Sequence, residues 1–122
     1  MILAAGAGRR LRPLTNSVPK ALVELDGIPL LEWVARNLLK AGAHRLIVNA
    51  HHLGNQVEAF IRNRDGLGVP TLVSREDSVS PIPLETGGAL AYAAPLFEAE
   101  APFLLHNADV VTNLHLGPIY HE

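Results

Sequence analysis

The chain opens with MILAAGAGRRLRPLTNSVPKAL, residues 1–22, in which a short apolar run leads into two glycines and four basic residues. MILAA is typical of a short buried strand, and the glycines and prolines that follow break any regular element between residues 6 and 19. No acidic residue occurs before Glu24, although the whole chain has a formal net charge of −2. A basic, glycine-rich loop directly after a strand is typical of a site for a small anion.

The composition limits the classes of protein to which the chain can belong. With 122 residues, 48% of them hydrophobic and 18% charged, it is one globular domain or part of one. The small negative net charge argues against general binding to nucleic acid or membranes. The absence of cysteine excludes disulfides and thiolate metal sites, and no apolar run approaches the length of a transmembrane helix. We therefore expect a cytoplasmic protein that binds a small anionic partner and neither nucleic acid nor a membrane.

Helical and strand patterns alternate along the rest of the chain. The expected helices cover residues 29–42, 55–64 and 86–97, and the expected strands cover residues 44–52, 69–76 and 101–111. This order predicts an α/β fold with a Rossmann-like, doubly wound, mostly parallel sheet and helices on both faces.

Ligands of such sheets bind outside the carboxyl ends of the strands. Three polar segments are expected at these ends, namely the loop of residues 6–20, the corner at residues 49–52, and residues 107–109. The ligand site is therefore expected where these three segments meet.

The opening loop has the composition of a phosphate site. The backbone N–H groups around Gly6 and Gly8 can approach phosphate oxygens closely, and arginine and lysine add charge-assisted hydrogen bonds. The P-loop pattern is absent, and a dinucleotide fingerprint fails because Leu11 occupies the third glycine position and Pro13 interrupts the helix that should follow. From the residues alone, a solvated basic loop whose glycines serve turns remains an alternative.

Residues 3–20 resemble the signature of the sugar-1-phosphate nucleotidyltransferases, L-A-A-G-x-G-x-R-[LM]-x-P-L-T-x-x-x-P-K. LETGGAL at residues 84–90 and HNADVV at residues 106–111 agree with the family in the same order. VNAHHLGNQVEAF at residues 48–60 resembles the bacterial branch that includes N-acetylmuramate-1-phosphate uridylyltransferase and mannose-1-phosphate guanylyltransferase-like proteins. The resemblance extends over essentially the whole chain.

The resemblance implies a transfer of a nucleotidyl group from an NTP to a sugar 1-phosphate, with release of pyrophosphate. It assigns catalytic roles to Arg10 and Lys20, a position near the sugar substrate to Asn107, and a Mg²⁺ ligand to Asp109. The nucleotide-binding residues that it implies are Leu3, Ala4, Ala5, Gly6, Gly8, Arg9, Arg10, Lys20, Glu85, Gly87 and Gly88.

Other polar residues have simpler expected roles. Arg12 occupies a variable position of the signature and is expected to be a surface charge. His51 and His52 are adjacent at a strand end, where side chains alternate between faces, so they make a poor metal pair and are expected to be structural. Gly8 is expected to tolerate no side chain, because the backbone there must approach a phosphate closely.

The resemblance also implies that residues 1–122 form a partial domain. Family catalytic domains are longer, and the segment that supplies most sugar contacts and a second metal-binding aspartate has no counterpart here. We expect an incomplete sheet and a partner, either the other half of the enzyme or a second copy of the chain. Two functions stay open, namely the NTP-binding half of an NDP-sugar-forming enzyme and a non-catalytic nucleotide-binding or regulatory module of the same fold.

Overall fold

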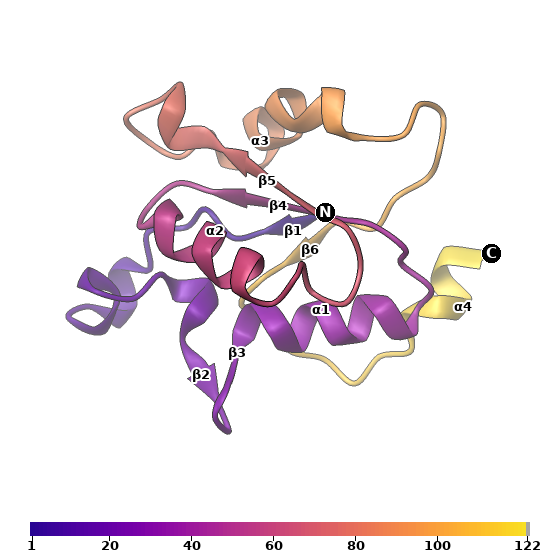
Figure 1. Cartoon of the computed structure of the whole chain (residues 1–122), viewed down its shortest axis with the longest axis horizontal. Coiled ribbons are helices and arrows are strands. Elements are labelled where there is room, and N and C mark those ends of the chain that lie inside the picture. Colours follow the sequence, from indigo (N-terminus) through magenta and orange to yellow (C-terminus); the bar gives the residue numbers. More distant parts are fainter. Residues whose placement is uncertain (122) are drawn as a thin grey trace.

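The computed structural model describes residues 1–121. Its strands are β1 (Ile2–Leu3), β2 (Glu24–Leu25), β3 (Ile28–Pro29), β4 (Leu46–Ala50), β5 (Thr71–Arg75) and β6 (His106–Asn107). Its α-helices are α1 (Leu30–Lys40), α2 (Gly54–Asn63), α3 (Glu85–Ala93) and α4 (Leu116–His121), and short 3₁₀ turns occupy much of the basic loop. Four strands form a sheet in the order β5-β4-β1-β6, with helices packed around it (Figure 1).

All pairings in the four-stranded sheet are parallel. Ile2 of β1 pairs with Val48 of β4 on one side and with His106 of β6 on the other. The chain runs outward from β1 to β4 and β5, and it then returns to place β6 on the opposite side of β1. The predicted parallel α/β sheet is therefore confirmed, and its topology reverses beside β1.

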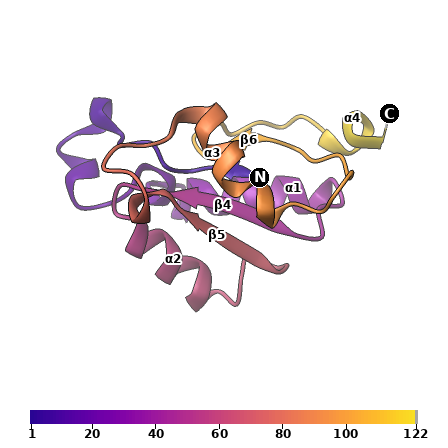
Figure 2. The same cartoon turned by 90° about the horizontal axis from the view of Figure 1, so that it is seen from above.

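Helices cover both faces of the sheet, as the alternating pattern predicts. Helices α1 and α2 bury their apolar sides, including Val34, Leu38 and Val57, against Ile2 and Val48. Helix α3 packs with Met1 and Ile47 in a second cluster on the opposite face. Figure 2 shows α2 and α3 on opposite sides of the sheet. Because side chains alternate along β4, its residues contribute to both clusters.

The expectation of a long buried strand at residues 101–111 is wrong. Only His106–Asn107 forms a strand, and six large apolar side chains near it are exposed. Among residues 1–121, β6 pairs only with β1, so its outer edge has no strand beside it. On that outer side, the backbone N–H and C=O groups of the segment find no strand among the described residues to pair with, and only two residues pair with β1. The exposed residues are Phe103, Leu105, Val110, Val111, Leu114 and Ile119.

Asp26 and Gly27 form the turn that joins β2 to β3 in a small antiparallel hairpin. Both turn residues have positive φ, 52° and 74°, as tight two-residue hairpin turns require. The Nε1–H group of Trp33 on α1 donates a hydrogen bond of 2.9 Å to the carbonyl oxygen of Leu25, which attaches the hairpin to the helix.

Over residues 1–121, no helix has both the length and the apolar character needed to cross a membrane.

Candidate functional site

A cavity of about 660 Å³ opens at the carboxyl ends of β1, β4 and β6. Its position follows from the topology, because the chain leaves β1 in one direction and β6 returns on the other side. The volume lies within the usual range of small-molecule sites. The cavity therefore lies where the three polar segments were expected to meet.

The structure brings most of the predicted site residues to this cavity. From the first 22 residues, the cavity lining contains Leu3, Ala4, Ala5, Gly6, Gly8, Arg9, Arg10 and Lys20. Glu85, Asn107 and Asp109 also line it. Gly87 and Gly88 instead lie in the first turns of α3 and are not part of the lining. Arg12 is exposed and also lies outside the lining, as expected for a surface charge.

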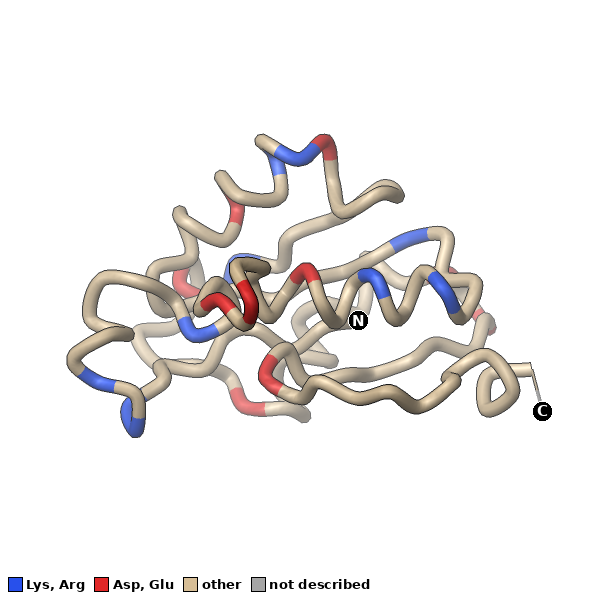
Figure 3. Tube along the Cα trace, turned by 90° about the horizontal axis from the view of Figure 1, so that it is seen from below, with Lys and Arg blue, Asp and Glu red and all other residues tan. Residues whose placement is uncertain are grey.

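The basic loop is held together by its own contacts. Gly8 has a φ of +63°, and the hydroxyl of the buried Thr15 donates a hydrogen bond of 2.6 Å to the Gly8 carbonyl oxygen. Arg9 and Arg10 are exposed beside this turn, and within residues 1–121 neither forms an ion pair. Figure 3 shows positive positions on the loop that extends from one end of the molecule. The loop therefore presents unpaired positive charge at the mouth of the cavity.

Lys20 and Asp109 form an ion pair across the cavity. The Lys20 Nζ atom lies 2.6 Å from Asp109 Oδ2, and the two side chains are 35% and 40% exposed. The hydrogen bond from the ammonium group holds the pKa of the Asp109 carboxyl below its ordinary value, so this carboxylate is ionised at neutral pH. The predicted phosphate-binding lysine and the predicted metal ligand therefore contact each other.

Asp109 has the chemistry of a weak Mg²⁺ ligand. It offers an ionised, partly exposed carboxylate, which is the donor type that this hard cation prefers. Within residues 1–121, no group of three or more His, Cys, Asp or Glu side chains is arranged to hold a metal. The residues present fit Mg²⁺ only if ligand oxygens such as phosphates complete its shell.

A buried carboxylate in the lining of the cavity, that of Glu76, was missed by the sequence analysis. Glu76 is fully buried, and its two oxygens accept hydrogen bonds of 2.7 Å from Asn49 Nδ2 and 2.9 Å from the Leu84 N–H group. Asn49 Oδ1 in turn accepts a hydrogen bond of 2.6 Å from the Ala4 N–H group. The only sequence signal for Glu76 is an acidic residue directly after an apolar strand, at the edge of the sheet where ligands bind.

The two adjacent histidines attach loops on either side of the cavity. His51 Nε2 lies 2.8 Å from the Ser80 carbonyl oxygen, and His52 Nε2 lies 2.7 Å from the Thr15 carbonyl oxygen. A carbonyl oxygen only accepts hydrogen bonds, so each Nε2 atom carries the proton. Gln56 on α2 adds a hydrogen bond of 2.8 Å to the Ser17 carbonyl oxygen. Both histidines thus have the structural contacts expected of them.

The His52 contact leads to a stability prediction. His52→Phe keeps a planar ring and removes the donor to Thr15, so we expect the free energy of unfolding to fall by about 0.5–1.5 kcal/mol. Urea unfolding followed by circular dichroism measures this loss. His44→Phe is the matched control, because His44 is 75% exposed and pairs only at the surface. Equal losses in the two variants would contradict the proposed attachment of the basic loop.

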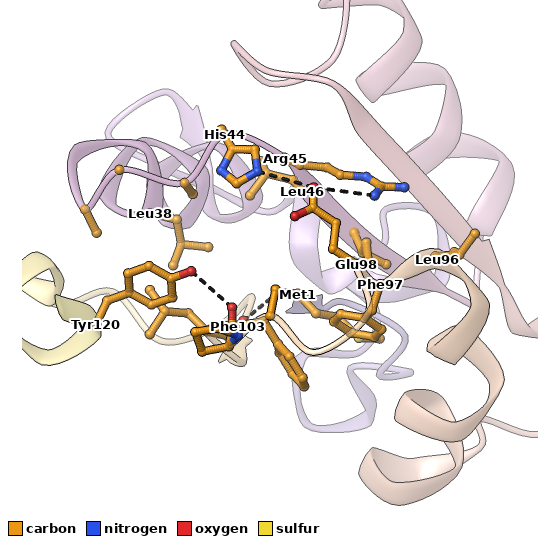
Figure 4. A pocket seen from close by; sticks show the side chains of 17 residues that line it. Met1, Leu38, His44, Arg45, Leu46, Leu96, Phe97, Glu98, Phe103 and Tyr120 are labelled. Carbon is orange, nitrogen blue, oxygen red and sulfur yellow. Dashed lines mark hydrogen bonds and ion pairs between the residues drawn. The ribbon is translucent and has the colours of Figure 1, made fainter. Parts of the chain in front are cut away.

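A smaller apolar cavity of about 110 Å³ lies at the opposite, amino end of the sheet (Figure 4). Its polar groups bind each other. Glu98 lies 3.3 Å from His44, the Met1 amino group donates to the Leu104 carbonyl oxygen, and the Tyr120 hydroxyl donates to the Pro102 carbonyl oxygen. Burial lowers the pKa of the Met1 amino group to about 6. Because the polar groups of the smaller cavity are already paired with one another, the cavity at the carboxyl ends of the strands is the candidate functional site.

Residues 1–121 match the family model described as nucleotidyl transferase. N-acetylmuramate alpha-1-phosphate uridylyltransferase of Neisseria meningitidis serogroup B is 40% identical over 114 residues, which are 93% of this chain and 48% of that protein. The protein of the same name from Caulobacter vibrioides is 40% identical over 118 residues, 96% of this chain and 48% of its own length. The chain thus spans about half the length of these two curated relatives.

Solved structures share the fold. The crystal structure of HddC from Yersinia pseudotuberculosis complexed with GMP-PN has a TM-score of 0.81 at 25% identity and covers 98% of this chain and 51% of that chain. The inositol-1-phosphate CTP transferase from T. maritima has a TM-score of 0.73 at 29% identity and covers 88% of this chain and 42% of that chain. The Rossmann-like fold class expected from the sequence is therefore confirmed.

Proposed function

The chain belongs to the nucleotidyl transferase family, and on this premise we propose that it supplies the NTP-binding half of a cytoplasmic enzyme that forms an NDP-sugar from an NTP and a sugar 1-phosphate. The observation that carries the proposal is the cavity at the carboxyl ends of the strands. There, the backbone at Gly6 and Gly8 lies beside three cationic side chains, with the Asp109 carboxylate opposite. This arrangement suits a polyphosphate that binds together with a divalent cation.

The proposed chemistry is an in-line displacement. An oxygen of the sugar phosphate attacks the α-phosphorus of the NTP, a new P–O bond forms, and the bond from that phosphorus to the bridging oxygen breaks to release pyrophosphate. No covalent enzyme intermediate is required, so the protein contributes positioning and charge stabilisation. Arg10 would stabilise negative charge on the departing pyrophosphate, and Lys20 would contact the α-phosphate.

Further roles follow from the lining of the cavity. Glu85 would border the base and ribose, with Gly87 and Gly88 behind it in the same helix and outside the lining, and Asn107 would lie near the sugar phosphate. Asp109 would hold Mg²⁺ jointly with the nucleotide, and the bound ion would neutralise phosphate charge. Most contacts to the sugar would come from the part of the relatives' length that this chain does not span. We expect no nucleic acid or membrane partner.

The relatives suggest which substrates to test first. Two proteins that are 40% identical to this chain are named N-acetylmuramate alpha-1-phosphate uridylyltransferase, so UTP and N-acetylmuramate 1-phosphate are the first pair. The test measures NTP binding by calorimetry and pyrophosphate release with Mg²⁺. Because the chain spans about half of these relatives, a non-catalytic nucleotide-binding module is the alternative. Binding of UTP without pyrophosphate release, also by a chain that spans the full length of these relatives, would favour that alternative.

Lys20→Ala tests the proposed phosphate contact. We expect it to weaken NTP binding by about 1.5–3 kcal/mol, the usual range for a hydrogen bond to a charged group. Calorimetric titration with UTP and Mg²⁺ measures the change. Lys40→Ala is the matched control, because Lys40 is exposed at the end of α1 and is not part of the cavity lining. Unchanged affinity in the Lys20 variant would contradict its role.

A further inference from the structure

Glu76 lies at the centre of a hydrogen-bonded relay that crosses the face of the sheet covered by α3. The relay runs from the Ala4 N–H group to Asn49 Oδ1, from Asn49 Nδ2 to Glu76 Oε2, and from the Leu84 N–H group to Glu76 Oε1. These distances lie between 2.6 and 2.9 Å. Asn49 is 3% exposed and Glu76 is 0% exposed, so water does not replace these bonds. None of the roles proposed above uses Glu76.

The two ends of the relay determine the direction of every hydrogen bond in it. Both ends are backbone N–H groups, which only donate. The Ala4 N–H group therefore requires an acceptor from Asn49, which turns the Asn49 NH₂ group toward Glu76. Glu76 then receives one donor at each oxygen, so only a side chain with two acceptor oxygens completes the relay. Glutamate supplies both, and glutamine of the same shape supplies only one.

The relay joins the two walls of the cavity. Ala4 is the first residue after β1 and leads into the glycine turn of the basic loop, whereas Leu84 directly precedes Glu85 and Thr86 on the other wall. Glu85 has a φ of +60°, which non-glycine residues rarely adopt, so its conformation depends on its surroundings. A displaced Leu84 backbone would move this strained residue directly.

We infer that Glu76 is a positioning residue, which acts through Asn49 and Leu84 to hold the two walls of the cavity at the separation that the nucleotide requires. What the cavity binds rests on the proposed function, whereas the relay itself rests on the four residues that form it. Glu76 touches no reacting atom in this scheme. Its carboxylate is stabilised in the buried position by one hydrogen-bond donor at each oxygen.

Because each hydrogen bond in the relay has a fixed direction, the relay can be tested by swapping the amide and the carboxylate between positions 49 and 76. Glu76→Gln leaves one donor facing another, and Asn49→Asp leaves two acceptor oxygens facing each other. The double variant restores one donor and one acceptor at every bond, because the carboxylate then lies at position 49 and the amide at position 76. We expect each single variant to speed hydrogen exchange of the Ala4 and Leu84 amides by about tenfold or more, and the double variant to recover most of that loss.

Hydrogen exchange of backbone amides, measured by NMR, tests whether the relay exists without the need for any ligand. Asp77→Asn is the matched control, since Asp77 is the neighbouring acidic residue, pairs with Arg75 and lies outside the relay. If Glu76→Gln does not fold, the double variant still decides. A folded double variant with slow exchange supports the relay, and one as defective as the worse single variant overturns it.

Binding of UTP with Mg²⁺ tests the positioning role. We expect Glu76→Gln to weaken binding by about tenfold and the double variant to regain most of the affinity. Slow amide exchange without recovered affinity in the double variant would overturn the positioning role. If the unmodified chain binds no NTP, the proposed function fails, yet the exchange rates still support or overturn the relay.

Discussion

Gly8→Val is expected to abolish NTP binding and to destabilise the basic loop. The φ of Gly8 is +63°, a left-handed conformation that costs an ordinary L-residue about 1–2 kcal/mol and a β-branched one more. A Cβ atom there would lie 2.7 Å from Thr15 Cγ2 and 3.2 Å from Lys20 Cβ. Thr15 is fully buried and holds the Gly8 carbonyl oxygen, so the loop must rearrange and carry Lys20 away from the cavity.

Gly6→Ala is the control for the stability part of this prediction. Gly6 also lines the cavity, but a Cβ atom there would meet nothing within 4 Å. We therefore expect Gly6→Ala to leave the melting temperature unchanged, whereas Gly8→Val lowers it. A thermal melt on each variant makes this comparison, and calorimetry with UTP measures binding by the Gly8 variant. Normal UTP binding by the Gly8 variant would mean that the phosphates bind elsewhere.

The contacts of Gly8 show which features of the loop the sequence signature predicts and which it does not. The sequence correctly marks the position as one without room for a side chain, but the expected reason was close approach to a phosphate. In the structure, the crowding atoms belong to Thr15 and Lys20, within the loop itself. Gly6, next to open space, is the glycine whose backbone a ligand can approach. A sequence motif identifies a constrained glycine without saying which neighbour constrains it.

The sheet was predictable because its signals are local. Alternating strand and helix patterns require parallel strands, and parallel strands place their polar ends at one edge. The segment at residues 101–111 was not predictable in the same way, because its apolar pattern does not reveal that β6 lies at the edge of the described sheet. The role of Glu76 also depends on distant elements, since Ala4 and Leu84 meet it only after the sheet has formed.

The pairing of Lys20 with Asp109 is another consequence of topology. The two residues are 89 positions apart, and each was assigned its own role from the resemblance. Because β6 lies directly beside β1, the segments that follow the two strands meet. Without a ligand, the proposed phosphate-binding cation and the proposed metal-binding anion therefore neutralise each other. A ligand must separate the two charges or replace both partners together.

This competition determines the expected behaviour of Asp109→Asn. The substitution keeps the shape of the side chain and frees Lys20, so metal-free NTP binding should become tighter. The ion pair is partly exposed and is worth only about 0.2–1 kcal/mol, which corresponds to a gain of about 1.5- to 5-fold in affinity. A purely structural Asp109 would instead leave metal-free affinity unchanged or lower it.

The same variant should lose most of the coupling between metal and nucleotide. In the unmodified chain, an NTP that recruits Lys20 leaves Asp109 free for Mg²⁺, and Mg²⁺ at Asp109 leaves Lys20 free for phosphate. Each ligand then tightens the other by one common factor, of the order of 5–150 for a coupling of about 1–3 kcal/mol. Asp109→Asn removes the charged metal ligand, so this factor should fall toward one. Titrations of UTP at several Mg²⁺ concentrations measure it.

Two further variants test this interpretation, one as a control for charge and one as a check on the ion pair. Asp65→Asn makes the same change at an exposed turn beyond α2, outside the cavity lining, and should alter neither the affinity nor the coupling. Lys20→Ala should raise the pKa of the Asp109 carboxyl toward its ordinary value, because the ammonium donor is lost. Full coupling in Asp109→Asn would contradict the proposed role of Asp109 as the metal ligand. Weaker metal-free binding would show that the ion pair does not compete with the nucleotide.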